Sequence, residues 1–143
     1  MNRPIEEPAW QLVRTEPPVR VDPSLRLWMG GPVDPQQTWV LMAEAQGPGD
    51  EHREVCPGVL LSSSKELTLQ LLQTPASSRA RVLVGYAGWG PGQLEKELAS
   101  SSWLTVDVDP SLIFGVPADE MWETAIRRLG ADPAALQTSS GVH

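Results

Sequence analysis

The sequence predicts an α+β fold, with a mixed, mostly antiparallel sheet and two or three packed helices. Short apolar runs at 59–61 and 82–84 have the length of buried strands. Clusters of glycine and proline, as at 88–92, separate such runs. Residues 117–130 carry apolar side chains three or four positions apart, which is typical of an amphipathic helix.

Size and composition fit one globular domain. The chain has 143 residues, of which 41% are hydrophobic, and this is enough to bury a sizeable core. It contains six tryptophans against one phenylalanine and one tyrosine. Because each buried indole removes on the order of 200 Å² from water, we expect the tryptophans to anchor the core.

The net charge and the cysteine content indicate where the protein is located and which partners it has. A net charge of −7 argues against broad contact with DNA phosphates, so no direct nucleic-acid binding is expected. Cys56 is the single cysteine, so no internal disulfide forms. No apolar stretch approaches the roughly 20 residues of a membrane span, and no signal peptide is visible. We therefore expect a cytoplasmic protein without membrane contact.

The N-terminal half predicts an extended segment followed by strands. Residues 1–23 are rich in proline, so we expect them to lie extended over a core, with Trp10 as an anchor. A short helix is expected at 9–13. Strands are predicted at 25–29, 38–43 and 59–61, with an irregular loop at 30–37 and a polar surface turn at 46–54.

The most ordered signal is a strand, a glycine-rich turn and a helix within residues 81–104. The strand ends at the first of four glycines, which are interleaved with one proline: Gly85, Gly88, Gly90, Gly92 and Pro91. Residues 93–99 are strong helix formers, with Leu94 and Leu98 on one face. Pro91 fits the first helical position, and residues 103–106 predict a further strand.

Two more helices are predicted. Ser63 and Glu66 match a capping box, so one helix is expected to start there and to end before Pro75. The other spans 117–130, with an inner face of four residues: Trp122, Ala125, Ile126 and Leu129. We expect an apolar patch at 112–114 and a tail, frayed at its end, from residue 132.

Several motifs are similar to those of one known family. The most specific is Gly85-Tyr86-Ala87-Gly88-Trp89-Gly90-Pro91-Gly92-Gln93-Leu94-Glu95, and others occur in the same order: Asn2-Arg3-Pro4, Met29-Gly30-Gly31-Pro32-Val33, Trp103-Leu104, and Trp122 with Arg128-Leu129-Gly130. On these residues the sequence resembles the AlgH/YqgE family, a widespread group of bacterial proteins of unassigned biochemical function. The resemblance covers nearly the whole chain, so residues 1–143 are interpreted as a single AlgH/YqgE-like domain.

The resemblance implies a coiled, partly barrel-like sheet. It also implies a regulatory role, since members of the family are often labelled transcriptional regulators. Trp39 and Met42 depart from the family pattern, which usually has a smaller hydrophobic residue or Phe and then His, so a role for a histidine there is absent. Members also carry strands of the sheet before Asn2-Arg3-Pro4. The chain is therefore interpreted as N-terminally shortened, with an exposed sheet edge that predicts a dimer or higher oligomer.

The glycine-rich turn invites a ligand-binding interpretation. Backbone N–H groups before a helix attract anions, so a small anion or nucleotide would bind at six residues: Tyr86, Gly88, Trp89, Gly90, Gly92 and Gln93. The glycine spacing is not the dinucleotide pattern G-x-G-x-x-G, and Pro91-Gly92 stand where a Walker A loop needs Lys-Ser/Thr. The alternative is a tight turn whose glycines let Trp89 and the helix pack closely.

No other pattern predicts a catalytic residue, a metal or a cofactor. Glu95 and Glu97 project from different helix faces, so they do not form an acid–base pair. His52 lies four residues from Cys56, but two ligands do not make a zinc site. Four arginines have two interpretations, a small basic patch or ordinary surface residues, of which we prefer the second: Arg79, Arg81, Arg127 and Arg128.

Three functional hypotheses follow. The leading one is a non-enzymatic regulatory or protein-interaction role, because no DNA-reading motif accompanies the acidic charge. The second is the small-ligand site at the glycine-rich turn, with Trp89 as a stacking wall. The third is a small hydrolase with an unrecognised site, and it lacks any recognisable nucleophile–base pair.

Overall fold

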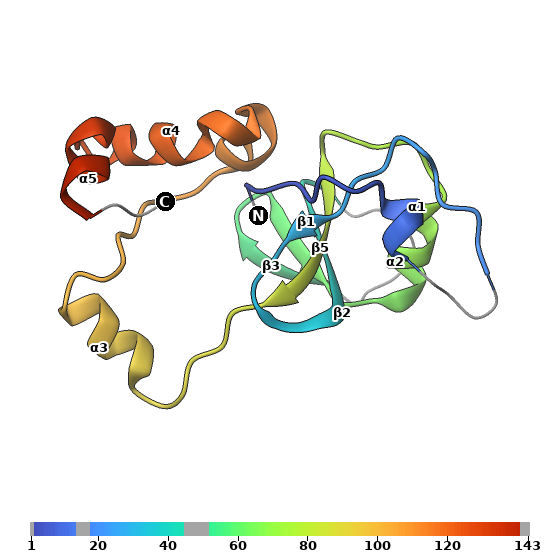
Figure 1. Ribbon diagram of the computed structural model, residues 1–143, viewed down its shortest axis with the longest axis horizontal. Coiled ribbons are helices and arrows are strands. Elements are labelled where there is room, and N and C mark those ends of the chain that lie inside the picture. Colours follow the sequence, from blue (N-terminus) through green and yellow to red (C-terminus); the bar gives the residue numbers. More distant parts are fainter. Residues whose placement is uncertain (1, 14–17, 45–51, 141–143) are drawn as a thin grey trace.

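The computed structural model describes residues 2–13, 18–44 and 52–140 and has the α+β fold that the sequence predicts (Figure 1). Five strands form one mostly antiparallel sheet in the order β1-β5-β2-β4-β3, and the sheet stays open within the described residues. Residues 46–51 of the polar turn predicted at 46–54 lie outside the described residues, and residues 52–54 belong to a strand.

The centre of the sheet is the antiparallel pair β2 and β5. The strands are β1 (Trp28–Met29), β2 (Val33–Met42), β3 (His52–Cys56), β4 (Val59–Ser62) and β5 (Ala80–Tyr86). Thr38 lies opposite Val84 and begins the regular β2–β5 ladder. β1 runs parallel to β5 on one side, and the β3–β4 hairpin continues the sheet on the other. The N-terminal segment lies along β1, since Pro4 bridges to Trp28.

Two strand predictions are wrong in their extent, one strand was missed, and one predicted strand is absent. β2 starts at Val33 rather than at residue 38, because Val33 pairs with Tyr86 across an irregularity that holds Asp34 at a φ of 45°. The predicted strand at 25–29 shrinks to β1. The sequence also misses β3, whose polar residues belong to an edge strand. Residues 103–106 are irregular, since no strand lies beside them in the described part of the chain.

Helices occupy the rest of the described chain. They are α1 (Ala9–Leu12), α2 (Lys65–Leu72), α3 (Gln93–Ala99), the π-helical turn η1 (Ser111–Gly115), the 3-10 turn η2 (Ala118–Glu120), α4 (Met121–Arg128) and α5 (Pro133–Ser140). The cap of α2 is Ser64 rather than Ser63, because the Ser64 hydroxyl accepts the N–H of Leu67 at 3.2 Å. α5 replaces much of the predicted tail.

The two faces of the sheet cover separate cores, as the alternation of side chains along a strand requires. One core gathers residues from α1, the segment before β1, α2 and one face of β2 and β5: Ala9, Leu25, Leu27, Leu72, Val40, Met42 and Val82. The other contains Leu41, Val59, Leu83 and Ile113. Trp10 is 53% exposed, so the expectation that it anchors the N-terminal segment is wrong, and the buried Ala9 of α1 does so instead.

Residues 87–108, which we call the aromatic arm, leave the sheet after β5. Figure 1 shows α3, drawn in yellow, standing apart from the sheet, with extended chain on both sides of it. No residue of α3 is fully buried. The arm carries four large apolar side chains that remain exposed: Trp89, Leu98, Trp103 and Leu104. Tryptophans therefore gather at the surface here, contrary to their expected role as core anchors.

β3 has a strand neighbour on one side only in the described sheet, so one sheet edge is exposed there. Its residues include Arg53 and Glu54, and such charged side chains oppose edge-to-edge pairing. Self-association through an edge stays a prediction. None of the described helices has the length and apolar character needed to cross a membrane.

Candidate functional site

The two glycine motifs of the sequence cross at a backbone contact. A Cβ atom on Gly31 would lie 2.2 Å from the carbonyl carbon of Tyr86, and one on Gly85 would lie 2.2 Å from the carbonyl oxygen of Gly31. A Cβ on Gly30 would lie 2.3 Å from the carbonyl oxygen of Gly85. Gly85 also has a φ of +74°. Only glycine fits these three positions, and Pro32 then leads the chain into β2.

The turn that follows β5 is looser. A Cβ on Gly88 would lie 3.9 Å from its nearest neighbour, and one on Gly90 would lie 3.8 Å from its nearest neighbour. Gly92, at a φ of +75°, is the residue that precedes the first turn of α3. Pro91 therefore stands before the cap, and its predicted place as the first helical residue is wrong. Close backbone packing requires glycine at 85 but not at 88 or 90.

Glu97 of α3 organises the polar contacts of the aromatic arm. Its Oε2 accepts the indole N–H of Trp89 at 3.0 Å and that of Trp103 at 2.5 Å. Its Oε1 accepts the side-chain amide of Gln93 at 3.0 Å, and Gln93 in turn accepts the backbone N–H of Gly90 at 3.0 Å. The Trp89 and Trp103 rings meet edge to face, with centroids 5.8 Å apart. One carboxylate thus ties the turn, the helix and the following segment together.

These hydrogen bonds fix the charge state of Glu97. The indole of Trp103, then that of Trp89 and the amide of Gln93, stabilise the carboxylate and lower the pKa of Glu97. A carboxylate that accepts three donors is a poor general base near neutral pH. Trp89 and Trp103 are still 39% and 48% exposed. Their polar N–H groups are satisfied while much of their apolar ring surface meets solvent.

Tyr86 belongs to a different aromatic pair. Its ring meets that of Trp39 edge to face, with centroids 6.4 Å apart, on the sheet. The indole N–H of Trp39 is buried without a hydrogen-bond partner among the described residues. The six residues predicted to bind a ligand are therefore divided: Tyr86 packs on the sheet, whereas Trp89, Gly90 and Gln93 are joined on the arm.

An anion site at this turn stays a prediction. The N–H of Gly90 is donated to Gln93, and Pro91 has no N–H to offer. The carboxylate of Glu97 is bonded to both Trp89 and Gln93, so it places a negative charge behind the same turn. This charge opposes the binding of an anion there, and it favours a different role for the arm.

Arg81 corrects the interpretation of the arginines as surface residues. It is only 8% exposed, and its guanidinium carbon lies 4.1 Å from the centroid of the Trp28 ring. Burial lowers the pKa of the Arg81 guanidinium, which nevertheless stays charged. The alternation of side chains along a strand could have predicted this burial. Arg81 and Leu83 are two residues apart, so they share one face of β5, and Leu83 is buried.

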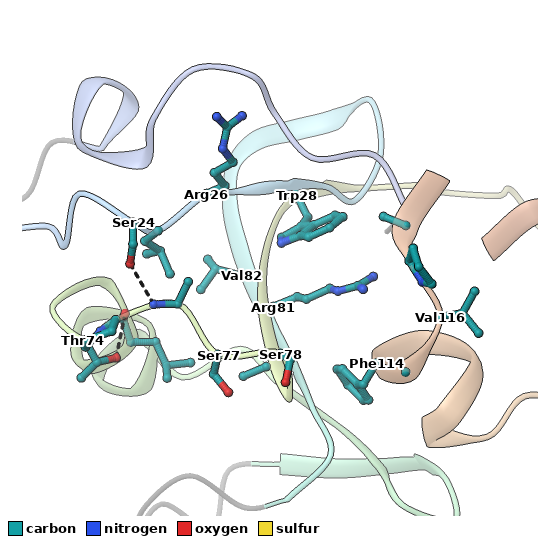
Figure 2. A pocket seen from close by; sticks show the side chains of 18 residues that line it. Ser24, Arg26, Trp28, Thr74, Ser77, Ser78, Arg81, Val82, Phe114 and Val116 are labelled. Atoms are coloured by element: carbon teal, nitrogen blue, oxygen red, sulfur yellow. Dashed lines mark hydrogen bonds between the residues drawn. The ribbon is translucent and has the colours of Figure 1, made fainter. Parts of the chain in front are cut away.

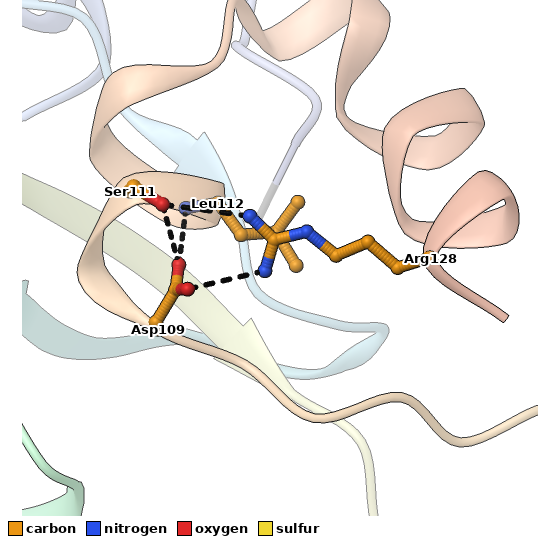
Figure 3. Close-up of polar contacts among 4 residues, drawn as sticks. All are labelled: Asp109, Ser111, Leu112 and Arg128. Carbon is orange, nitrogen blue, oxygen red and sulfur yellow. Dashed lines mark hydrogen bonds and ion pairs between the residues drawn. The ribbon is translucent and has the colours of Figure 1, made fainter.

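A second polar cluster joins η1 to α4, as Figure 3 shows. Asp109 accepts the hydroxyl of Ser111 at 2.7 Å and the backbone N–H of Leu112 at 2.9 Å, and it pairs with Arg128 at 3.3 Å. The Ser111 hydroxyl, then the Leu112 N–H, lower the pKa of Asp109. Such a carboxylate is a weak base, so Asp109 is poorly suited to activate the Ser111 hydroxyl as a nucleophile. The cluster instead holds the start of η1 and connects it to α4 through Arg128.

The His52–Cys56 pair does not develop into a metal site. Both residues lie on β3, where four positions along an extended strand span about 13 Å. The described residues contain no group of three His, Cys, Asp or Glu side chains that could hold a metal ion.

Comparisons with known proteins agree with the motifs. The family model described as AlgH-like matches residues 1–134. A UPF0301 protein of Anaeromyxobacter sp. is 38% identical over 117 residues, which are 79% of this chain and 58% of that protein. A UPF0301 protein of Bordetella avium is 39% identical over 117 residues, which are 81% of this chain and 58% of that protein. The chain thus spans less than two thirds of the length of these relatives.

Two solved structures have a similar fold. The solution structure of the AlgH protein from Pseudomonas aeruginosa has a TM-score of 0.70 and 28% identity, and the match covers 99% of this chain and 76% of that one. A crystal structure of a Corynebacterium diphtheriae protein has a TM-score of 0.58 and 20% identity over 89% of this chain and 67% of that one. The second likeness shows the fold alone.

Proposed function

The chain belongs to the AlgH-like family, and we propose that it acts as a non-enzymatic protein-interaction module whose aromatic arm binds a partner protein. One observation carries the proposal. Glu97 accepts both indole N–H groups, so Trp89 and Trp103 are fixed in place with apolar ring surface exposed. Aromatic residues with fixed rotamers are the usual anchors of protein interfaces, because little conformational entropy is lost when they bind.

The neighbouring residues suggest the chemistry of the partner. Leu98 and Leu104 add further exposed apolar surface on the same arm. The charged residues of the arm are mainly acidic: Glu95, Glu97 and Asp107, with Lys96 as the one cation. We therefore expect the partner to offer an apolar pocket with a basic rim, since complementary charge at a rim steers association.

This proposal is compatible with the label of transcriptional regulator that the family often carries, if regulation occurs through a protein partner. An acidic chain regulates through a protein partner more readily than through DNA phosphates. We also propose that the interaction occurs in the cytoplasm, because a single cysteine suits a reducing compartment.

Site-specific photocrosslinking in bacterial cells tests the proposal. A photoreactive amino acid replaces Leu104, and a matched control replaces Val55 of β3, which has the same 55% exposure away from the arm. We expect one discrete adduct from position 104 and none of that mass from position 55. The adduct should be lost when Trp89→Ala and Trp103→Ala are added.

The captured protein must then bind the purified chain. We expect the double alanine variant to weaken this binding by at least about a hundredfold, because anchor residues each contribute about 2 kcal/mol or more. Equal binding by the folded wild-type and double-variant chains would contradict the proposal, as would equal adducts from positions 104 and 55.

A further inference from the structure

The aromatic arm carries a negative charge that is held by neutral donors. Glu97 accepts the indole N–H groups of Trp89 and Trp103 and the side-chain amide of Gln93. None of the three ion pairs in the described part of the chain includes Glu97. Because the indole of Trp103, then that of Trp89, lower the pKa of Glu97, its carboxylate is ionised at neutral pH. The arm therefore presents one uncompensated charge beside two aromatic rings.

The carboxylate of Glu97 can accept a further donor. An ionised carboxylate has about four acceptor sites, two on each oxygen. Oε2 accepts both indoles, whereas Oε1 accepts only the amide of Gln93 among the described residues. Glu97 is partly exposed, so a donor from outside the chain can reach Oε1.

The two indole rings offer faces to a cation. An edge-to-face pair covers one face of only one ring, and Trp89 and Trp103 are 39% and 48% exposed. The negative face of an indole attracts a cation within about 6 Å of the ring centroid. Donation of the N–H to a carboxylate makes the ring more electron-rich, which strengthens this attraction. A cation over either ring also lies within the Debye length, about 8–10 Å, of the Glu97 carboxylate.

The chain itself shows how an arginine contacts an indole. In the cleft that Figure 2 shows, the side chain of Arg81 extends along the Trp28 ring, with its guanidinium carbon 4.1 Å from the ring centroid. A guanidinium stacks in this way because it is planar and weakly hydrated, and its N–H groups still donate within its own plane. The ammonium of a lysine is compact and strongly hydrated, so it is less suited to stacking.

We propose that the aromatic arm recognises an arginine side chain of its partner protein, stacked against the Trp89–Trp103 pair and donating to Oε1 of Glu97. The inference rests on the proposed function, because it names the group that the basic rim of the partner places on the arm. It gives Glu97 two roles, since the same carboxylate holds the indoles and binds the incoming cation.

Four capped amino acids test this chemistry on the purified chain: the N-acetyl amides of arginine, citrulline, lysine and leucine. Citrulline has nearly the shape of arginine without its charge, and leucine supplies only apolar surface. Two-dimensional NMR follows the indole N–H signals of Trp89 and Trp103 at constant ionic strength. Because a single residue binds weakly, the probes are used at concentrations on the order of 10–100 mM.

We expect the arginine probe to give saturable shifts of both indole signals. Citrulline and leucine should bind at least about tenfold more weakly, because neither makes the cation–π contact or the ion pair. Lysine should bind about threefold more weakly than arginine, because it does not stack. Trp10 of α1 is an internal control, since it is 53% exposed and its N–H is bonded to no carboxylate among the described residues. Its signal should not follow the titration.

Two matched variants test the carboxylate. Glu97→Gln keeps an oxygen that accepts an indole N–H but removes the charge, so it should weaken arginine binding at least about tenfold. It should leave citrulline binding within about twofold, whereas loosening of the two indoles would weaken both probes. Glu95→Gln removes the same charge from the same helix and should leave arginine binding within about twofold. Circular dichroism confirms that each variant is folded.

Several outcomes would overturn the inference. They are equal affinity for the arginine and citrulline probes, tighter binding of lysine than of arginine, no saturable shift at either indole, and equal weakening of arginine binding by Glu97→Gln and Glu95→Gln.

Failure of the proposed function is seen separately, in the crosslinking from position 104. A discrete adduct there without arginine binding here would leave the interaction module in place and remove only the arginine as its target. Arginine binding without any adduct would instead contradict the partner protein.

Discussion

An alanine at position 31 tests whether backbone contact holds the two glycine motifs together. A Cβ on Gly31 would lie 2.2 Å from the carbonyl carbon of Tyr86 and 2.4 Å from its oxygen. These are backbone atoms at the end of β5, so no side-chain rotation relieves the contact. Overpacking of this kind costs about 1–3 kcal/mol and occasionally more. We expect Gly31→Ala to lower the free energy of unfolding by about 3 kcal/mol.

Two further alanines separate steric contact from backbone strain. Gly85→Ala should cost about 4 kcal/mol, because a φ of +74° adds about 1–2 kcal/mol to a Cβ contact of 2.2 Å. Gly88→Ala is the matched control in the same motif, with its nearest neighbour at 3.9 Å. It should change the free energy of unfolding by no more than about 0.5 kcal/mol.

Urea denaturation followed by far-UV circular dichroism measures these differences. A domain of this size is stable by about 5–15 kcal/mol, so losses of 3–4 kcal/mol are large and easily resolved. Equal midpoints and slopes for Gly31→Ala and Gly88→Ala would refute the reasoning, since the two positions differ mainly in the backbone contact.

Three other predictions use different properties of the chain. Asp109 has a lowered pKa, so its stabilisation is fully present above the ordinary pKa of an aspartate and is lost as pH falls through the folded-state value; the wild-type melting temperature should therefore fall more on acidification than that of Asp109→Asn, and parallel curves would contradict this. Trp39→Phe removes a buried N–H that has no partner among the described residues, and relief of that cost, about 1–3 kcal/mol, offsets part of the packing lost with the smaller ring. Trp28→Phe has no such relief and also weakens the stacking on Arg81. Calorimetry should therefore find Trp39→Phe at least about 1 kcal/mol less destabilising than Trp28→Phe, and the reverse order would contradict this reasoning. The net charge of −7 predicts no mobility shift of random duplex DNA at physiological salt, and a clear shift would disprove it.

Local sequence signals predicted the elements whose partners are close in the chain or whose pattern is strongly periodic. β4 and β5 were found because apolar runs of strand length are buried on both faces. α2 was found from the serine and glutamate cap signal before it, and the helical region from residue 118 was found because its apolar spacing is regular. The prediction of a strand at 103–106 failed because strands need partners, and the chain there runs out along the arm.

The site was less accessible to prediction than the fold. The glycine string was located correctly, but the reason for Gly85 lies in the distant Gly31, which the sequence alone does not place against it. Glu97 was considered only as a partner of Glu95 in an acid–base pair, whereas its two indole donors, Trp89 and Trp103, precede and follow α3 in the sequence. Arg81 was wrongly expected at the surface, because its charge was given more weight than its position on the same strand face as the apolar Leu83.

The exchange of the indole N–H groups with solvent tests the pre-ordered arm most directly. Two-dimensional NMR of the free chain, without any partner, measures it for Trp89 and Trp103, with Glu97→Ala as the variant and Glu95→Ala on the same helix as the control. We expect both indoles to exchange at least about tenfold faster in Glu97→Ala than in the wild type or Glu95→Ala, because each loses its charged acceptor. Equal exchange in all three proteins would show that Glu97 does not hold the tryptophans, and the proposed interaction surface would lose its basis.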